Sequence, residues 1–155
     1  MRKRLVFSCV LATSLVACGG GSSPNNPSSP PQPQYPNVAG SYSGTTTIVL
    51  PELGASARVS CPTTTTVTQS GANVNIAPLV LRGDCGSLSV PMGAQTIDTT
   101  GSLGAASNFT YDDPSCGGRY TASASGGFFG RELRIAINAV SSVCYNLNMT
   151  INLTR

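Results

Sequence analysis

The sequence contains no histidine and no tryptophan, and its single lysine is Lys3. Without histidine the chain cannot assemble a Ser-His-Asp or Cys-His catalytic group. A general base acting near neutral pH would have to be a carboxylate whose pKa is strongly raised. We therefore predict a protein that is not an enzyme and that uses no cofactor.

Charge is also scarce, because only 10% of the residues are charged. Three of the nine basic residues are Arg2, Lys3 and Arg4, which leaves six arginines (9 − 3 = 6) against six acids in the rest of the chain. The formal charge of +3 therefore belongs to the N-terminus. Nucleic-acid binding needs clustered positive charge, so we expect no nucleic-acid partner.

No apolar run is long enough to span a bilayer. The N-terminus instead has the parts of a secretory signal, with a basic start, an apolar core over 5–16 and small residues at its end. That core is about 12 residues long, whereas a spanning helix needs about 20. An ordinary signal cut at Ala17 or slightly later, with Cys18 incidental, is one interpretation of this pattern.

The end of this segment, Leu15-Val16-Ala17-Cys18, resembles the lipobox of bacterial lipoproteins. The resemblance implies that residues 1–17 are a removed signal peptide and that Cys18 carries the lipid, which gives the protein a membrane partner. Gly19 follows, where an Asp would resemble an inner-membrane retention signal. We therefore expect a location in the cell envelope, at the outer membrane if the source is Gram-negative.

Residues 18–37 are predicted to be the lipidated N-terminus and a linker. Positions 19–37 read GGGSSPNNPSSPPQPQYPN, with six of the eleven prolines and no charged residue. Such a segment cannot bury enough apolar surface to offset its ordering entropy. We expect it to be a disordered tether.

Residues 38–155 alternate apolar and polar side chains with a period of two, which predicts strands and no helix. The clearest alternation is at the C-terminus, where we expect Tyr145, Leu147, Met149, Ile151 and Leu153 to point inward. We predict strands over 40–50, 55–69, 74–81, 88–92, 94–99, 107–111, 119–128, 133–139 and 145–153. The fold class is therefore all-β, an antiparallel up-and-down meander curling into a small barrel of seven to eight strands with a filled core. An immunoglobulin-like β-sandwich is the alternative.

Cys9 lies in the signal and Cys18 is the proposed lipid site, so four cysteines remain: Cys61, Cys85, Cys116 and Cys144. An even number in an exported chain predicts two disulfides. A zinc site is the alternative, but the spacings of 24, 31 and 28 include no C-x-x-C pair.

Hairpin symmetry predicts how these cysteines pair. Folding the chain about 71–72 places Cys61 opposite roughly residue 82, close to Cys85, and a hairpin centred near 130 places Cys116 opposite Cys144. Neighbouring strands supply the Cα separation of about 4.4 to 6.8 Å that a disulfide needs. We predict the pairs Cys61 with Cys85 and Cys116 with Cys144.

The domain opens with Gly40-Ser41-Tyr42-Ser43-Gly44, a G-x-[WY]-x-G pattern, and ends in an alternating apolar strand. In this it resembles small bacterial lipoproteins of uncharacterised function, and the opening also resembles the start of lipocalins. The resemblance implies a tethered, non-enzymatic binding or interaction domain. Its partner could be an envelope protein, a glycan or a small apolar ligand.

Two further hypotheses involve the acidic residues. A hydrolase would need two of the six acids to converge in a cleft as a carboxylate pair: Glu52, Asp84, Asp98, Asp112, Asp113 and Glu132. The adjacent Asp112 and Asp113 could contribute to a calcium site, but no EF-hand-like spacing surrounds them. We therefore expect a solvated turn at this position and no metal.

Overall fold

The computed structural model describes residues 31–54, 56–104, 107–114 and 116–155. The chain divides into two units, Met1–Pro31 and Gln32–Arg155, and the second is the β domain. The predicted signal peptide 1–17, Cys18 and the linker as far as residue 30 lie outside the described residues. Within the described residues, no helix has the length and apolar character needed to cross a membrane.

The described residues form ten strands and two single-turn 3-10 helices. The strands are β1 (Gly40–Val49), β2 (Arg58–Ser70), β3 (Asn73–Ile76), β4 (Leu79–Leu81), β5 (Ser89–Val90), β6 (Gly93–Thr96), β7 (Ser107–Asp113), β8 (Gly118–Phe129), β9 (Glu132–Ser141) and β10 (Leu147–Thr154). The 3-10 helices are η1 (Pro51–Leu53) and η2 (Gly83–Cys85). The predicted all-β class is confirmed.

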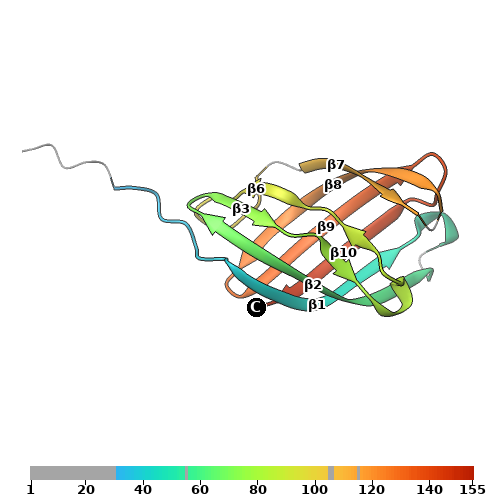
Figure 1. Ribbon diagram of the computed structural model, residues 1–155, viewed down its shortest axis with the longest axis horizontal. Coiled ribbons are helices and arrows are strands. Elements are labelled where there is room, and N and C mark those ends of the chain that lie inside the picture. The colour runs from blue at the N-terminus through green and yellow to red at the C-terminus, as the bar shows by residue number, and fades with distance from the viewer. Residues whose placement is uncertain (1–30, 55, 105–106, 115) are drawn as a thin grey trace, which may run out of the picture. The chain divides into compact units, whose positions relative to one another are not determined.

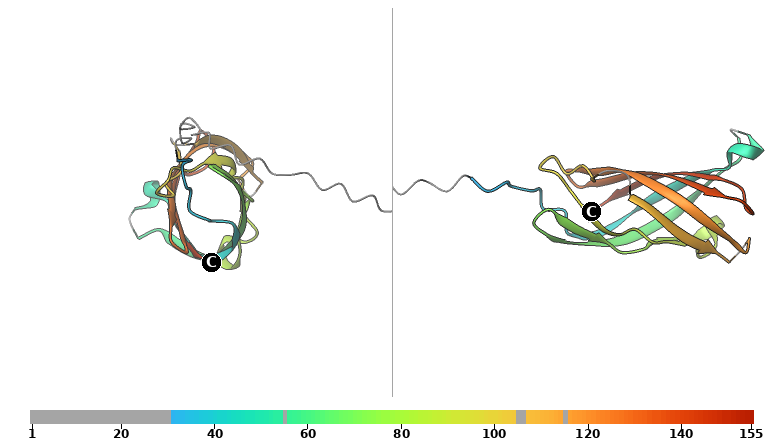
Figure 2. Two further views of the ribbon diagram at one scale, coloured as in Figure 1. Left: turned by 90° about the vertical axis from the view of Figure 1, so that its left-hand side faces the viewer. Right: turned by 90° about the horizontal axis from the view of Figure 1, so that it is seen from above.

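The strands form one antiparallel sheet that curls into a nearly closed, eight-stranded barrel (Figure 1 and Figure 2). Its hydrogen-bonded order is β5-β4-β2-β1-β10-β9-β8-β7, with β3 beside β2 and β6 beside β3. β3 and β4 together form the predicted return strand, interrupted at Ala77-Pro78, and β5 and β6 are separated in the same way around Pro91. A single curled sheet corresponds to the predicted barrel and not to the two-sheet sandwich.

Alternation along the strands fills the interior of the barrel. On β2 the side chains of Cys61, Thr63, Thr65 and Val67 are buried while their neighbours are exposed, as the period of two predicted. The largest fully buried side chains come from strands all around the sheet: Tyr42, Ile76, Leu79, Leu81, Phe128, Leu133, Ile135, Ile137, Met149, Ile151 and Leu153.

The prediction that Tyr145 points inward is wrong. Its side chain is 52% exposed, because β10 begins only at Leu147 and Tyr145 lies in the preceding loop. Asn146 connects this loop to η1 and to the end of β9. Its backbone N–H donates to Glu52 (3.0 Å) and its side-chain oxygen accepts from the Ser141 N–H (3.1 Å).

The barrel has two distinct ends. We call the end where β2, β8 and β10 finish the entry end, and the end where β1, β7 and β9 finish the distal end. At the entry end the Val38 N–H donates to the Gln69 side-chain oxygen (2.7 Å), and the Gln69 amide donates to the Pro36 carbonyl (2.8 Å). Tyr35 also packs against the core. Contacts with the barrel therefore begin a few residues before the predicted domain start at 38.

Hydrogen bonds close the ring of strands at the entry end. The segment 97–103 forms a tight turn after β6, in which Ile97 pairs with Leu103, and Ser102 pairs with Gly127 of β8. The Leu103 N–H donates to the carbonyl of Gly126 (2.9 Å). The segment 97–103 thus connects the β6 side of the sheet to β8.

Glycines allow this close approach. The Phe128 N–H donates to the Gly101 carbonyl (2.8 Å), and a Cβ atom on Gly127 would lie 2.8 Å from that same oxygen. Asp98 holds the turn by accepting hydrogen bonds from Thr100 and from the Ser102 N–H. The Thr100 hydroxyl is the main cause of the lowered pKa of the Asp98 carboxyl.

Candidate functional site

Both predicted disulfides form, and both lie at the distal end. The Cα atoms of Cys61 and Cys85 are 5.9 Å apart, and those of Cys116 and Cys144 are 6.0 Å apart. Gly118 leaves room for the second bridge, because a Cβ atom there would lie 2.3 Å from the Cys144 sulfur. The bridges fix the loops that surround the distal opening of the barrel.

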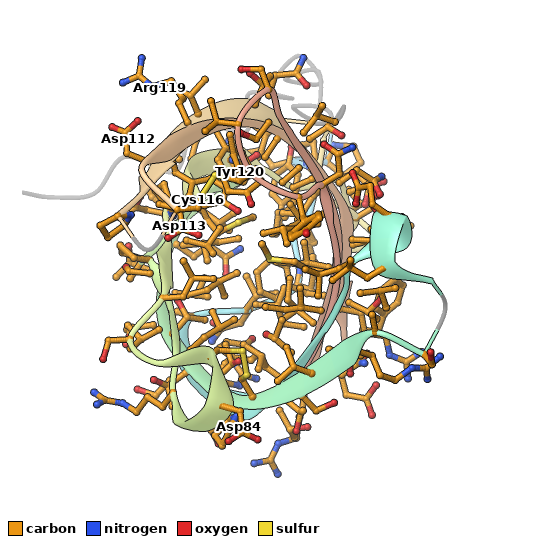
Figure 3. The ribbon with its side chains drawn as sticks, turned by 90° about the vertical axis from the view of Figure 1, so that its right-hand side faces the viewer. Asp84, Asp112, Asp113, Cys116, Arg119 and Tyr120 are labelled. Carbon is orange, nitrogen blue, oxygen red and sulfur yellow. A yellow bond between two sulfur atoms is a disulfide. The ribbon has the colours of Figure 1, made fainter. Side chains whose placement is uncertain are left out.

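A hollow of about 630 Å³ lies at this end, beside the Cys116–Cys144 bridge, and we call it the distal hollow. It is lined by residues from η1, the end of β7, the start of β8 and the loop before β10: Leu50, Glu52, Asp113, Cys116, Tyr120, Val143, Cys144, Tyr145 and Leu147. Figure 3 looks onto this end, with Asp113, Cys116 and Tyr120 close together and Asp112 and Arg119 pointing outward. The hollow combines apolar, aromatic and acidic side chains.

Stacked tyrosines form the wall of the barrel beside this hollow. Tyr111 of β7 and Tyr120 of β8 are register partners, and their ring centroids are 5.0 Å apart. The Tyr120 hydroxyl donates to the Tyr145 carbonyl (2.8 Å), whereas the buried Tyr111 hydroxyl has no hydrogen-bond partner among the described residues. Burial raises the pKa of both phenols, and the charge of Asp113 adds to this effect.

Two of the six acids line the distal hollow. Glu52 from η1 and Asp113 from β7 both line it. Asp112 points outward and pairs with Arg119 (2.8 Å), and that hydrogen bond is the main cause of its lowered pKa. Glu132 likewise pairs with Arg134 on the outer surface. Glu52 and Asp113 are the two acids that share the lining of this hollow.

The calcium hypothesis for Asp112 and Asp113 finds no cluster of ligands. Across the described residues, no group of three or more His, Cys, Asp or Glu side chains is placed to hold a metal ion. Calcium needs about six to eight oxygen ligands. The arrangement around Asp112 is instead an exposed ion pair with Arg119.

Exposed apolar side chains surround the distal hollow. Val143 is 72% exposed and Tyr145 is 52% exposed, and both line the hollow. Leu53, next to Glu52 in η1, is 53% exposed. Exposed apolar side chains that gather beside a hollow are typical of interaction surfaces.

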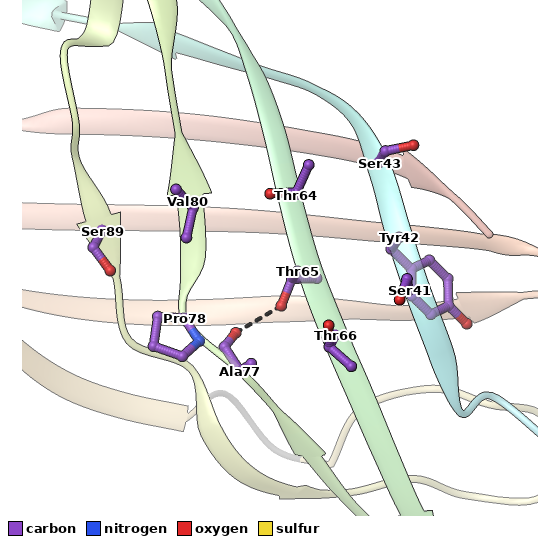
Figure 4. Close-up of a pocket in the computed structure, with 10 residues that line it drawn as sticks. All are labelled: Ser41, Tyr42, Ser43, Thr64, Thr65, Thr66, Ala77, Pro78, Val80 and Ser89. Atoms are coloured by element: carbon purple, nitrogen blue, oxygen red, sulfur yellow. Dashed lines mark hydrogen bonds between the residues drawn. The ribbon is translucent and has the colours of Figure 1, made fainter.

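A second hollow of about 560 Å³ lies on the outside of the barrel, over β1, β2 and β4 (Figure 4). Its lining is rich in hydroxyl groups and contains no charged side chain: Ser41, Tyr42, Ser43, Thr64, Thr65, Thr66, Ala77, Pro78, Val80 and Ser89. It forms where β3 and β4 separate, and the Thr65 hydroxyl donates to the Ala77 carbonyl there (2.7 Å). Sequence reasoning missed this groove, although the outward Ser and Thr of β1 and β2 were visible in the alternation.

In comparisons with known proteins, no family model, no characterised protein and no solved structure matches this chain.

Proposed function

We propose that this protein is a lipoprotein of the cell envelope whose barrel binds a partner at its distal end, without catalysis. In this proposal residues 1–17 are a removed signal peptide, Cys18 carries the lipid, and 18–37 form the linker. The outer membrane is the proposed location. The lipobox resemblance and the two disulfides, which favour an oxidising compartment, support this assignment.

The observation that carries the binding proposal is the position of the distal hollow. It lies at the end of the barrel opposite the contacts that Pro36 and Val38 make with Gln69, where the chain enters the domain. The Cys116–Cys144 disulfide is part of its lining and braces its loops. Rigid loops lose little conformational entropy when they bind, so bracing favours recognition.

The exposed side chains favour a protein as the partner. Tyrosine and apolar residues are typical of the centre of protein interfaces, and charged residues are depleted there. Leu53, Val143 and Tyr145 provide such a surface around the hollow. A glycan or a small apolar ligand would instead have to occupy the distal hollow itself.

Photo-crosslinking can test this surface with a matched control. A photoreactive phenylalanine analogue would replace Tyr145 at the distal end or Phe129 at the entry end, which are 52% and 53% exposed. We expect a discrete crosslinked protein partner in cells from position 145 and none from position 129. Crosslinking only from 129, or from neither position, would contradict the proposal.

The anchor is tested separately by Cys18→Ser. Because the lipid is proposed to be the membrane attachment, the variant should leave the membrane fraction while its barrel stays folded and disulfide-bonded. The measurements are cell fractionation and the mass of the N-terminal peptide. Retention of the variant in membranes would show that the anchor is elsewhere.

A carboxylate-pair hydrolase is the second candidate, favoured only by the joint position of Glu52 and Asp113 in the distal hollow. Such an enzyme would lose turnover in both Glu52→Gln and Asp113→Asn. A panel of ester and glycoside substrates tests this, and the absence of any turnover by the unaltered protein would remove the candidate.

A further inference from the structure

The barrel wall has an open seam between β5 and β7. These strands are the two ends of the hydrogen-bonded strand order, and no pairing joins them in the described part of the chain. A hollow of about 440 Å³ lies at this seam, with one wall from 85–89 and the other from Asp112, Asp113 and Pro114. The seam therefore exposes two strand edges that face a shared hollow.

The two edges are held in place independently of each other. Cys85, just before β5, is bonded to Cys61 of β2, and Cys116, just after β7, is bonded to Cys144 beyond β9. Neither bridge crosses the seam. Each edge is thus attached to its own side of the barrel, and the closed ring at the entry end limits how far the two sides can separate.

The register shows which backbone groups of β7 face the seam. Gly126 and Phe128 of β8 bond to the segment 101–103, so the even-numbered residues of β8 direct their backbone groups away from β9. Their register partners on β7 are odd-numbered, as in the pairs Phe109 with Ala122 and Tyr111 with Tyr120. Backbone groups alternate in direction along a strand.

The remaining residues of β7, Asn108, Thr110 and Asp112, therefore direct their backbone N–H and C=O groups into the seam. On the opposite edge, the Leu88 carbonyl accepts from the Leu81 N–H. The backbone groups of Leu88 therefore face β4, and those of Ser89 face the seam. Unpaired strand edges of this kind are templates for an added strand.

We propose that the seam binds an extended peptide, which adds as a strand antiparallel to β7. This inference goes beyond the proposed binding at the distal hollow and adds a separate recognition surface at a strand edge. β7 is the main partner because the backbone N–H and C=O groups of three of its residues face the seam, whereas β5 is only two residues long. Antiparallel pairing is slightly more stable per residue than parallel pairing.

The residues at the seam indicate which sequence pattern the peptide should have. Its inward side chains would meet Leu88 and Phe109, which are partly buried against the core. Its outward side chains would lie beside Asp112, which is also ion-paired with Arg119 of β8. Among the described residues, the lining itself contains two carboxylates and no basic side chain. An alternation of apolar and basic residues therefore fits. The Pro-rich, uncharged segment 19–37 of this chain lacks that pattern.

The test uses an acetylated and amidated Val-Lys-Val-Lys-Val-Lys-Val peptide, matched to the seven residues of β7. Amide hydrogen exchange of the folded protein is followed by NMR. In the free protein, the amides of Phe109 and Tyr111 should be protected and those of Asn108, Thr110 and Asp112 should exchange rapidly. With peptide present, exchange at these three amides should slow by about tenfold or more.

Two control peptides separate strand addition from simple charge attraction. N-methylation of the Lys residues removes the N–H groups that face β7 in antiparallel pairing, and it should abolish the protection. N-methylation of the Val residues should preserve it. Equal protection by the two methylated peptides would overturn the proposal.

Two control proteins locate the site. Asp112→Asn and Glu132→Gln each remove one exposed ion pair, but only the first lies at the seam. Peptide affinity should fall several-fold in Asp112→Asn and stay unchanged in Glu132→Gln. Failure of the peptide to protect the three amides would overturn the seam proposal, as would their protection in the free protein by self-association. The crosslinking test at Tyr145 is unaffected by either result.

Discussion

At the scale of single residues, three tyrosines inside the barrel differ in what their hydroxyls contact. Tyr42 donates to the Val38 carbonyl (2.8 Å) and Tyr120 to the Tyr145 carbonyl (2.8 Å). The Tyr111 hydroxyl is buried and has no hydrogen-bond partner in the part of the chain that the structure describes. A buried polar group without a hydrogen bond costs about 1 to 3 kcal/mol, so these residues should respond differently to the loss of the hydroxyl.

Phenylalanine substitutions test this difference. Tyr111→Phe should raise the free energy of unfolding by about 1 kcal/mol, because it removes an unpaired buried hydroxyl. Tyr42→Phe should lower it by about 1 kcal/mol, because the Val38 carbonyl loses its donor. Chemical denaturation measures both. A decrease of equal size in the two variants would mean that the Tyr111 hydroxyl has a stabilising partner.

The same tyrosines predict how stability depends on pH. Burial is the largest cause of the raised pKa of Tyr42, Tyr111 and Tyr120. Above the usual tyrosine pKa of about 10, the unfolded chain loses phenolic protons that the folded chain keeps. The unfolded chain then binds fewer protons, so the free energy of unfolding should fall as the pH rises beyond that value.

Denaturation at a series of alkaline pH values measures this slope. Tyr111→Phe should reduce it, because one of the three phenols that stay protonated in the folded state is then absent. A stability that is constant from neutral pH to beyond pH 10 would contradict the assignment of these phenols to the core.

At the scale of elements, closure of the barrel depends on the contact between β8 and the segment 97–103. Gly127→Ala would place a Cβ atom 2.8 Å from both the Gly101 oxygen and the Ser102 Cα. We expect a loss of about 1 to 3 kcal/mol in unfolding free energy, typical of overpacking at a tightly packed site. The exposed Ser125→Ala is the control. Thermal and chemical unfolding measure the stability of both variants. Equal stabilities would mean that the backbone around Gly127 shifts to accommodate the Cβ atom with no loss of unfolding free energy.

The sequence predicted most strands but not this closure, for a physical reason. Alternation identifies a strand only when one face is buried and the other is solvated over several residues. The closing turn is short, and its pairing depends on Gly101, Gly126 and Gly127, which carry no side chains to reveal an inward face. Its partner β8 is also distant in the chain, so no hairpin symmetry indicates the contact.

The same reasoning explains which parts of the candidate site were predictable. The cysteine pairs followed from hairpin symmetry, since the register of β8 and β9 pairs Tyr120 with Ser141 just beyond the Cys116–Cys144 bridge. The exposure of Tyr145 did not follow, because apolar alternation continues past the start of β10. Contacts between η1 and the loop before β10, such as Glu52 with Asn146, join residues 94 positions apart.

At the scale of the whole domain, the two ends of the barrel are stabilised by different interactions. At the entry end, backbone hydrogen bonds through 97–103 complete the ring. The distal end contains the seam between β5 and β7, and there both disulfides hold the loops. The covalent bridges therefore lie where the hydrogen-bonded ring is incomplete.

Removing the bridge between Cys116 and Cys144 tests this division. The double substitution Cys116→Ser and Cys144→Ser releases a loop with a sequence separation of 28, and the chain-entropy relation predicts a loss of about 3 to 4 kcal/mol. Hydrogen exchange should accelerate in the loop before β10 and at the distal end of β7, while the amides of Leu103 and Phe128 at the entry end keep their protection relative to global unfolding. The matched control, Cys61→Ser with Cys85→Ser, should accelerate exchange in β4 and β5 and leave the loop before β10 protected. If either variant instead opened both ends equally, the domain would unfold as one cooperative unit and the division between the ends would be wrong.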